Sequence, residues 1–319
     1  MDRLNKLPLF GLQPLILILL LTLIVIVATI LQPGFLSYFH MTMILYGNSI
    51  LGILALAQTM CILSGGLDLS IGSTYWVTIM AGAMLMKNHG FLFPMIVCIL
   101  LGGVIGLING IGISKLKIPH VVMTLAMMIF LTGILYVTTG GGGKGRAAEA
   151  LIIFSTKRIL GFPVIAIIWV ALTLILYFII NNTCFGWKVR ALGSNARTCY
   201  CSGINVDSVQ MLVYFISGIL AAIAGLLYLG WARTPYPTFQ SGAGVGADIT
   251  LKSIAAVIIG GTLFSGGRGG VLRTLLGVLV LAFLFSILSM VGLKLEWQMI
   301  LNGIIILLVV GIHGRFSSE

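Results

Sequence analysis

Long runs of apolar residues recur along the whole chain and constrain its fold more than any other feature. One run extends from Leu15 to Leu31 without a charged side chain, and about ten comparable segments can be drawn along the sequence. A helix of about 20 apolar residues spans the hydrocarbon core of a bilayer, where every backbone polar group needs a partner inside the protein. The runs therefore predict an all-α integral membrane protein.

The predicted membrane segments are joined mostly by short links, so we expect a single transmembrane domain over residues 1–319. The segments are 12–31, 43–63, 68–86, 91–113, 119–138, 159–181, 209–230, 250–263, 271–291 and 297–312. Several are short or interrupted by glycine. The prediction is a polytopic bundle of about ten transmembrane helices with broken or re-entrant segments, and between about eight and eleven spans remain open.

The composition agrees with a surface that faces lipid. Hydrophobic residues make up 59% of the chain and charged residues 8%, whereas about a quarter of the residues in soluble domains are charged. The net charge of +11 comes from Lys and Arg placed singly or in pairs between apolar runs. This pattern excludes a basic nucleic-acid face and places the charge in links and at membrane surfaces.

The basic residues also predict an orientation. Cytoplasmic links are enriched in Lys and Arg, and Arg3, Lys6 and the basic link 182–208 would lie on one side of a bundle with an even number of spans. Both termini are therefore expected in the cytoplasm. The bias is slight, because the links on the opposite side also carry Lys and Arg.

Little in the sequence predicts an enzyme or a metal site. Seven acidic residues, four histidines and five cysteines are scattered, with no carboxylate pair, no CxxC motif and no histidine beside a nucleophile. The stretch Gly140–Gly145 contains Lys144 but lacks the glycine spacing and the following Ser or Thr of a phosphate-binding loop. Small residues four apart, at Gly102, Gly106 and Gly110 and again within 217–225, instead predict close helix packing.

A helix break is predicted where the apolar run that ends at Leu63 meets two adjacent glycines. The segment holds an acidic residue and two serines, and its candidate residues are Ser64, Gly65, Gly66, Asp68 and Ser70. Asp68 is expected to cap the following helix by accepting hydrogen bonds from its free N–H groups. Contact with a solute and a role in gating remain open beside the capping role.

A second break repeats the Ser-Gly-Gly sequence of the first. Its candidate residues are Gly260, Gly261, Ser265, Gly266 and Gly267. Paired broken helices are typical of transporters built from internal repeats. A match of three residues also arises by chance in a chain with 41 glycines, so the sequence leaves both explanations open.

Three segments together resemble a known family. These are LSGGLDLSIGS (63–73), IAAVIIGGTLFSGGRGG (254–270) and the link FGWKVRALGSN (185–195) with Ser202-Gly203-Ile204. They resemble the permeases of bacterial ATP-binding-cassette importers of the ribose, xylose, arabinose and galactoside class, and with Asn109-Gly110 and Lys117-Ile118-Pro119 the likeness covers nearly the whole chain in order.

The resemblance implies a multi-pass permease subunit of the bacterial inner membrane that translocates a monosaccharide or similar small polar sugar. Its partners would be a second permease subunit, an ATPase subunit that holds ATP and Mg²⁺, and a periplasmic sugar-binding protein. This chain would hold no cofactor. The resemblance also implies that 182–208 is a cytoplasmic coupling loop that contacts the ATPase through Phe185, Gly186, Arg190, Gly193, Asn195, Gly203 and Ile204.

Departures from the family pattern leave details open. Residues 198–201 read Thr-Cys-Tyr-Cys, Thr250 and Lys252 stand where acidic residues are usual, and Arg273 replaces a usual glycine. Such changes suit one partner of a heterodimer. The alternative function is an ion-coupled secondary transporter of a small polar solute, which would need an intramembrane relay of acidic groups that this chain barely offers.

The polar and aromatic residues of the apolar runs are candidates to line a solute pathway. They are Asn48, Gln58, Tyr75, Trp76, Asn109 and Asn302. The sequence does not show which of them converge, and it does not name the sugar.

Overall fold

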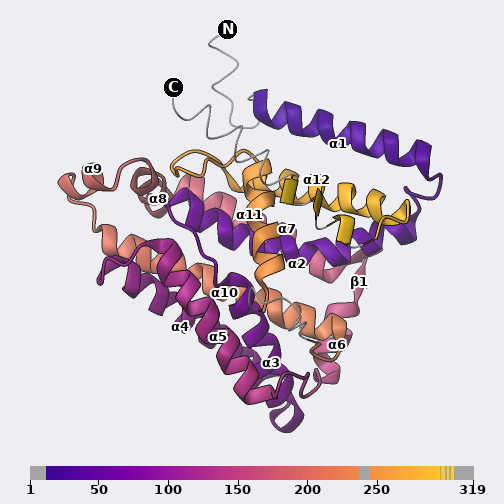
Figure 1. Ribbon diagram of the computed structural model, residues 1–319, viewed down its shortest axis with the longest axis horizontal. Helices are drawn as coiled ribbons and strands as arrows, with labels where there is room; N and C mark the ends of the chain where they lie inside the picture. Colours follow the sequence, from indigo (N-terminus) through magenta and orange to yellow (C-terminus); the bar gives the residue numbers. More distant parts are fainter. Residues whose placement is uncertain (1–11, 237–244, 295, 299, 302, 305–319) are drawn as a thin grey trace.

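The computed structural model describes residues 12–236, 245–294, 296–298, 300–301 and 303–304. Its helices are α1 (Leu12–Leu31), α2 (Tyr38–Leu63), α3 (Ile71–His89), α4 (Leu92–Ser114), α5 (His120–Thr139), α6 (Glu149–Thr156), α7 (Val164–Asn182), α8 (Cys184–Ser194), α9 (Ala196–Cys201), α10 (Val206–Ala232), α11 (Ala247–Ile259) and α12 (Val271–Met290). The strands β1 (Arg158–Ile159) and β2 (Phe162–Pro163) form a short antiparallel hairpin between α6 and α7. In Figure 1, α8 and α9 lie at the end of the bundle opposite α6.

Of the helices that the structure describes, seven are long and apolar enough to cross a membrane: α1, α2, α4, α5, α7, α10 and α12. The segment predicted at 68–86 forms α3, which is enclosed by other helices and so needs less apolar character. The segment predicted at 250–263 forms α11, whose 13 residues reach about 20 Å, less than the bilayer core of about 30 Å. Most of the predicted segment 297–312 lies outside the described residues.

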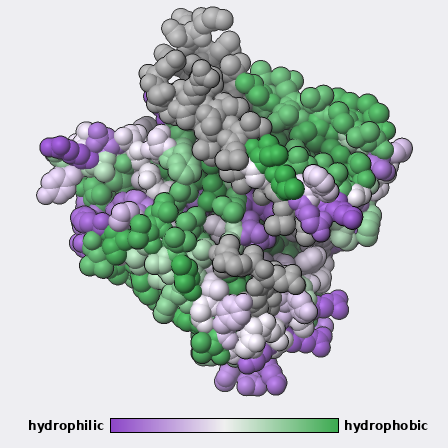
Figure 2. Space-filling model, viewed as in Figure 1, coloured by the Kyte–Doolittle hydropathy of each residue, from purple (hydrophilic) through white to green (hydrophobic). Residues whose placement is uncertain are grey.

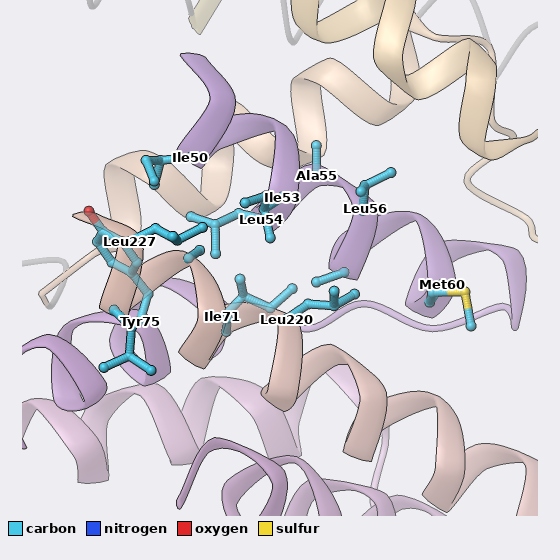
Figure 3. Close-up of a cluster of buried hydrophobic side chains, with 14 of the residues drawn as sticks. Ile50, Ile53, Leu54, Ala55, Leu56, Met60, Ile71, Tyr75, Leu220 and Leu227 are labelled. Carbon is cyan, nitrogen blue, oxygen red and sulfur yellow. The ribbon is translucent and has the colours of Figure 1, made fainter. Parts of the chain in front are cut away.

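Helix α2 runs through the centre of the fold and packs against α10, α12, α11 and α7. Its side chains Ile53, Leu54 and Leu56 are fully buried and meet Ile71 and Leu220 in the core cluster drawn in Figure 3. The outermost helix is α1. Only 17% of its apolar stretch is buried inside the protein, whereas 67% of the corresponding stretch of α10 is buried. Its apolar side chains form the broad hydrophobic surface at the upper right of Figure 2, which suits contact with lipid.

Helices α4 and α10 approach closely through glycine, as the spacing predicts. A side chain on Gly102 or Gly106 would overlap the backbone carbonyl oxygens of Gly218 or Tyr214, and Gly110 lies against Met211. The second set of small residues, within 217–225 of α10, faces other parts of the fold. Gly225 packs on α3, and Ser217 donates a hydrogen bond to Asp68. The packing prediction is confirmed, with different partners for the two sets.

Candidate coupling and gating site

The chain breaks between α2 and α3, where the sequence places two adjacent glycines. Gly65 has a φ of 82°, a left-handed conformation that favours glycine. The N–H of Gly66 donates to the carbonyl oxygen of Cys61 at 2.9 Å, and this bond closes the end of α2. A side chain on Gly66 would strike His120 and the Tyr214 hydroxyl. The turn of residues 64–70, called the first turn below, therefore depends on glycine for both its shape and its packing.

The Asp68 carboxylate is the centre of a buried polar network. Its Oδ1 accepts hydrogen bonds from the backbone N–H and the hydroxyl of Ser70, at 2.9 and 2.6 Å. Its Oδ2 accepts from the Ser217 hydroxyl of α10 at 3.1 Å, and Asn109 of α4 donates to Ser70 at 2.8 Å. Asp68 is 2% exposed. The carboxylate thus joins the first turn to α10, and Ser70 extends the network to α4.

The predicted cap is wrong in its detail. Asp68 bonds Ser70, which precedes the first residue of α3, and not the free N–H groups inside that helix. The Gly72 N–H is instead bonded by the Thr250 hydroxyl of α11 at 3.0 Å. Gly72 and Gly246 lie so close together that a side chain on either would overlap the backbone of the other. The absence of side chains lets the starts of α3 and α11 approach closely. The cap therefore comes from a residue 178 positions further along the chain.

The second Ser-Gly-Gly sequence also forms a turn, between α11 and α12. Gly261, Gly266 and Gly267 have φ values of 80°, 85° and 71°, which glycine adopts without strain. Backbone hydrogen bonds close the turn, from Leu263 to Arg268 and from Gly266 to Leu263. Ser265 lies exposed at its tip. Residues 260–270 are called the second turn below.

The two turns meet each other and helix α8 at one point. The Gly267 N–H donates to the Leu63 carbonyl oxygen at 3.0 Å. A side chain on Gly193 would overlap that same oxygen, and one on Gly266 would lie 2.8 Å from both the Gly193 carbonyl oxygen and the Gly65 Cα. We call Gly65, Gly193, Gly266 and Gly267 the glycine junction. It joins three segments that lie far apart in the sequence.

Arg190 fastens helix α8 to the second turn. Its guanidinium donates to the Gly269 carbonyl oxygen at 2.9 Å and to Asn181 Oδ1 at 3.0 Å. Burial, together with the positive charge of Arg273, lowers the pKa of Arg190 from its ordinary value. The planar guanidinium reaches two acceptors at once, which a lysine ammonium does less well. Arg190 therefore ties the end of α7, helix α8 and the second turn together.

The predicted coupling loop 182–208 folds into α8 and α9. Asn195 caps α9 by accepting from the Thr198 N–H at 3.0 Å, and Gly186 packs on the Ile180 carbonyl oxygen. Phe185 and Ile204 are half-buried against the core. Gly203 has a φ of 76° with open space around it. Five of the seven predicted residues thus shape or anchor this segment, and Gly193 and Arg190 connect it to the turns.

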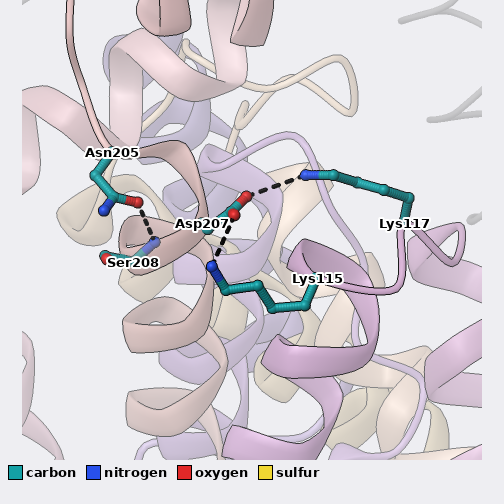
Figure 4. A network of polar contacts seen from close by, with 5 residues as sticks. All are labelled: Lys115, Lys117, Asn205, Asp207 and Ser208. Atoms are coloured by element: carbon teal, nitrogen blue, oxygen red, sulfur yellow. Dashed lines mark hydrogen bonds and ion pairs between the residues drawn. The ribbon is translucent and has the colours of Figure 1, made fainter.

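An ion-paired cluster, which no sequence motif predicts as a site, lies where α10 begins. Asp207 accepts from Lys115 and Lys117 at 3.2 and 3.1 Å, as Figure 4 shows. Asn205 caps the helix by accepting from the Ser208 N–H at 3.0 Å. Both lysines are largely exposed, so the pairs contribute about 1 kcal/mol or less each. The cluster fixes the α4–α5 link to α10.

Of the residues predicted to line a pathway, the five that the structure describes do not share one cavity. Tyr75 and Trp76 pack edge to face, with ring centroids 5.4 Å apart, in an aromatic cluster with Tyr228. Asn109 belongs to the Asp68 network, whereas both amide atoms of the buried Gln58 lack a hydrogen-bond partner among the described residues. Asn48 lines an open groove between α2 and α12. Asn302 lies outside the described residues.

The fold and the site define a class of protein: a multi-pass helical membrane protein with paired helix breaks. Residues 40–310 match the family described as "Branched-chain amino acid transport system / permease component". The chain therefore belongs to this permease family, and as a permease component it is a transport subunit and not an enzyme.

Named relatives support the assignment. The chain is similar to the ribose import permease of Escherichia coli strain K12, with 34% identity over 304 residues, 94% of this chain and 92% of the relative. It is also similar to the ribose import permease of Bacillus subtilis strain 168, with 34% identity over 93% of this chain and 92% of the relative. The fructose import permease of Rhizobium meliloti is 31% identical over 93% of this chain and 83% of the relative. No solved structure matches the chain.

Proposed function

We propose that this chain is the membrane-spanning permease subunit of an ATP-binding-cassette importer for a monosaccharide or similar small polar sugar. The relatives named for ribose and fructose import support the sugar class. The observation that carries the proposal is the glycine junction, because it brings the predicted coupling segment into backbone contact with both helix breaks. A displacement of α8 would reach the end of α2 directly, and it would reach α11 and α12 through the second turn.

In this proposal, the driving force comes from a partner. The chain has no nucleotide-binding motif in its sequence, so ATP and Mg²⁺ would be bound by a separate ATPase docked on α8 and α9. Trp187 and Tyr200 expose 69% and 76% of their surfaces there, which suits a protein contact. A second permease subunit, identical or related, would complete the pathway, and a periplasmic binding protein would deliver the sugar.

The proposed orientation places α8, α9 and both termini in the cytoplasm of a bacterial inner membrane. The two turns and α8 share one end of the bundle, as the predicted order of spans requires. With α3, the short α11 and the predicted final segment added to the seven candidate spans, the count is about ten. In this scheme α11 crosses only part of the bilayer core, and the second turn covers the remaining depth.

Reconstitution of the complete importer tests the proposal. The chain is placed in liposomes with its ATPase and binding protein, and uptake of radiolabelled neutral monosaccharides is measured with and without ATP. The proposal predicts uptake that requires ATP and stops when the ATPase is inactivated. Uptake by this chain alone, abolished by collapse of the proton gradient and indifferent to the ATPase, would establish the secondary transporter instead.

A further inference from the structure

An open groove of about 380 Å³ lies between α2 and α12, away from the glycine junction. We infer that this groove is the outer mouth of the solute path and binds a neutral polyhydroxylated solute through Asn48, Ser286 and Ser289. The inference rests on the proposed function and adds the place where the solute is recognised. The groove's volume is at the small end of the range for ligand pockets, about 300–1,000 Å³.

The position of the groove follows from the direction of its two helices. Residues of the first half of α2, between His40 and Asn48, form one wall, and the last turns of α12, between Ala282 and Met290, form the other. Gln298 also lines the groove. Helix α2 ends at Leu63, which bonds the second turn, and α12 begins directly after that turn. The groove therefore lies at the opposite ends of both helices, the side that faces outward in the proposed orientation.

Polar groups line the groove at helical spacing. Ser286 and Ser289 are three residues apart on α12, and His40 and Asn48 are eight apart on α2, so each pair shares one helix face. His40 and Asn48 are therefore separated by about 12 Å along the axis of α2. Polar groups are costly on a helix face covered by lipid, and they persist where they face a partner, water or a solute. Their alignment on two facing helices indicates an aqueous recess.

Some of these polar groups have hydrogen-bonding capacity to spare. Asn48 donates to the Ile44 carbonyl oxygen at 2.9 Å, while its Oδ1 accepts from no other described residue. The Ser289 hydroxyl is exposed and makes no side-chain hydrogen bond with the described part of the chain. His40 Nε2 lies 2.8 Å from the Ser286 hydroxyl, a bond that orients that hydroxyl. A solute in the groove therefore meets an amide acceptor and at least two hydroxyl groups.

The same lining discriminates between solute classes. No carboxylate, ammonium or guanidinium group is among the described residues that line the groove. A free amino acid carries two charges, and burying either of them without a partner is costly. A sugar presents only hydroxyl groups, which amide and hydroxyl side chains match as donors and acceptors. The groove therefore favours a sugar over the branched-chain amino acids in the family's description.

The test compares uptake by the complete importer carrying Asn48→Leu, Ser286→Ala or the control Ser49→Ala. Ser49 is the neighbour of Asn48, is buried, and bonds the Leu45 carbonyl oxygen of its own helix outside the groove. A panel of radiolabelled pentoses and hexoses, ribose and fructose included, first identifies a sugar that the wild type carries. Asn48→Leu is expected to lower uptake of that sugar at subsaturating concentration about tenfold, Ser286→Ala several-fold, and Ser49→Ala less than twofold.

The outcomes separate this inference from the proposed function. Wild-type uptake of a sugar together with unchanged uptake by Asn48→Leu and Ser286→Ala overturns the groove and leaves the importer intact. ATP-driven uptake of leucine in place of every sugar overturns both the groove's chemistry and the sugar class. As a second measurement, a Ser289→Cys variant is expected to react with a water-soluble maleimide and to be protected by the transported sugar. Reaction only with a lipid-soluble reagent would show that lipid covers the groove and would overturn the inference.

Discussion

The two Ser-Gly-Gly turns share three residues but are held in different ways. The first turn is held by side chains of the surrounding bundle: Ser217 bonds Asp68, and the Tyr214 hydroxyl donates to the Leu67 carbonyl oxygen at 3.1 Å. The second turn is held by a backbone bond, from the Gly267 N–H to the Leu63 carbonyl oxygen, and by the Arg190 side chain of α8, which donates to the Gly269 carbonyl oxygen. Its tip residue Phe264 is 46% exposed.

This difference suggests that the first turn is a fixed element and that the second turn is a driven element, which moves with α8. The first turn is buried, and the polar network of Asp68, Ser70, Asn109 and Ser217 fastens it to α4 and α10. The second turn contacts the first turn and α8, and among the described residues few side chains of the rest of the bundle bond it, so it is the element that can follow α8.

Gly193→Ala should nearly abolish sugar uptake, because the added methyl group overlaps the Leu63 carbonyl oxygen and lies 2.5 Å from the Gly267 nitrogen. Both neighbours are backbone atoms and cannot rotate away. Separation of the junction at a cost of about 3 kcal/mol corresponds to a loss of about 100-fold. Uptake by the reconstituted importer measures the loss, with the amount of inserted protein determined by immunoblot.

The matched control is Gly133→Ala in α5, where a methyl group would meet nothing within 4 Å. This change should leave uptake within about twofold of the wild type, since helix propensity alone favours alanine by about 1 kcal/mol. An equal loss in both variants would show that glycine at 193 has no special role at the junction.

Asp68→Ala should destabilise the protein and affect the first turn. It leaves the Ser70 and Ser217 hydroxyl groups without their acceptor in a buried site, which costs about 1–3 kcal/mol for each unpaired group. Asp68→Asn keeps one acceptor oxygen and should lose about half as much. Thermal unfolding in detergent measures both variants. Unchanged stability of Asp68→Ala, or a clean change of preferred sugar, would contradict a structural role for the Asp68 carboxylate in the first turn.

Local features of the site could be predicted from sequence, and long-range contacts could not. Two adjacent glycines and a buried acid indicate the break near Asp68, because these residues stop a helix or need partners. The bond from the Gly72 N–H to the Thr250 hydroxyl oxygen joins positions 178 apart, and no local pattern encodes such a pairing. The likeness of the two turns was visible in the sequence, but their contact at Gly193 depends on how α8 folds back.

The number of spans shows the same limit. Apolar runs predict α1, α2, α4 and α7 well, because lipid contact demands apolar residues over the length of the bilayer. Helix α3 is covered by protein, so its sequence is not held to the composition of a lipid-facing span. Length and hydropathy therefore identify lipid-facing helices, whereas enclosed and short helices require the tertiary structure.

Arg190→Lys should weaken the driven element and spare the first turn. A lysine ammonium reaches the Gly269 carbonyl oxygen or Asn181 but bridges them poorly, so uptake should fall about three- to tenfold. Thermal stability should change less than in Asp68→Ala. Hydrogen exchange should increase in residues 262–270 and remain unchanged in residues 64–70. Increased exchange in both turns would show that they are held as one unit.

Gly203→Ala should have the smallest effect. Its φ of 76° disfavours alanine by about 1–2 kcal/mol, but no neighbouring atom lies within 4 Å of the added methyl group. The strain is confined to the link between α9 and α10, so uptake should fall by less than about threefold. A loss as large as that of Gly193→Ala would move the coupling contact from the glycine junction to this link.

In the proposed mechanism, the glycine junction transmits the movement of α8 to both turns. The number of ATP molecules hydrolysed per sugar imported tests it most directly, in liposomes that contain the complete importer with either wild-type chain or Gly193→Ala. The account predicts that Gly193→Ala retains at least about half of the ATP hydrolysis while import falls about 100-fold, so the ratio rises steeply. A ratio equal to that of the wild type, whether import is normal or reduced together with hydrolysis, would contradict it.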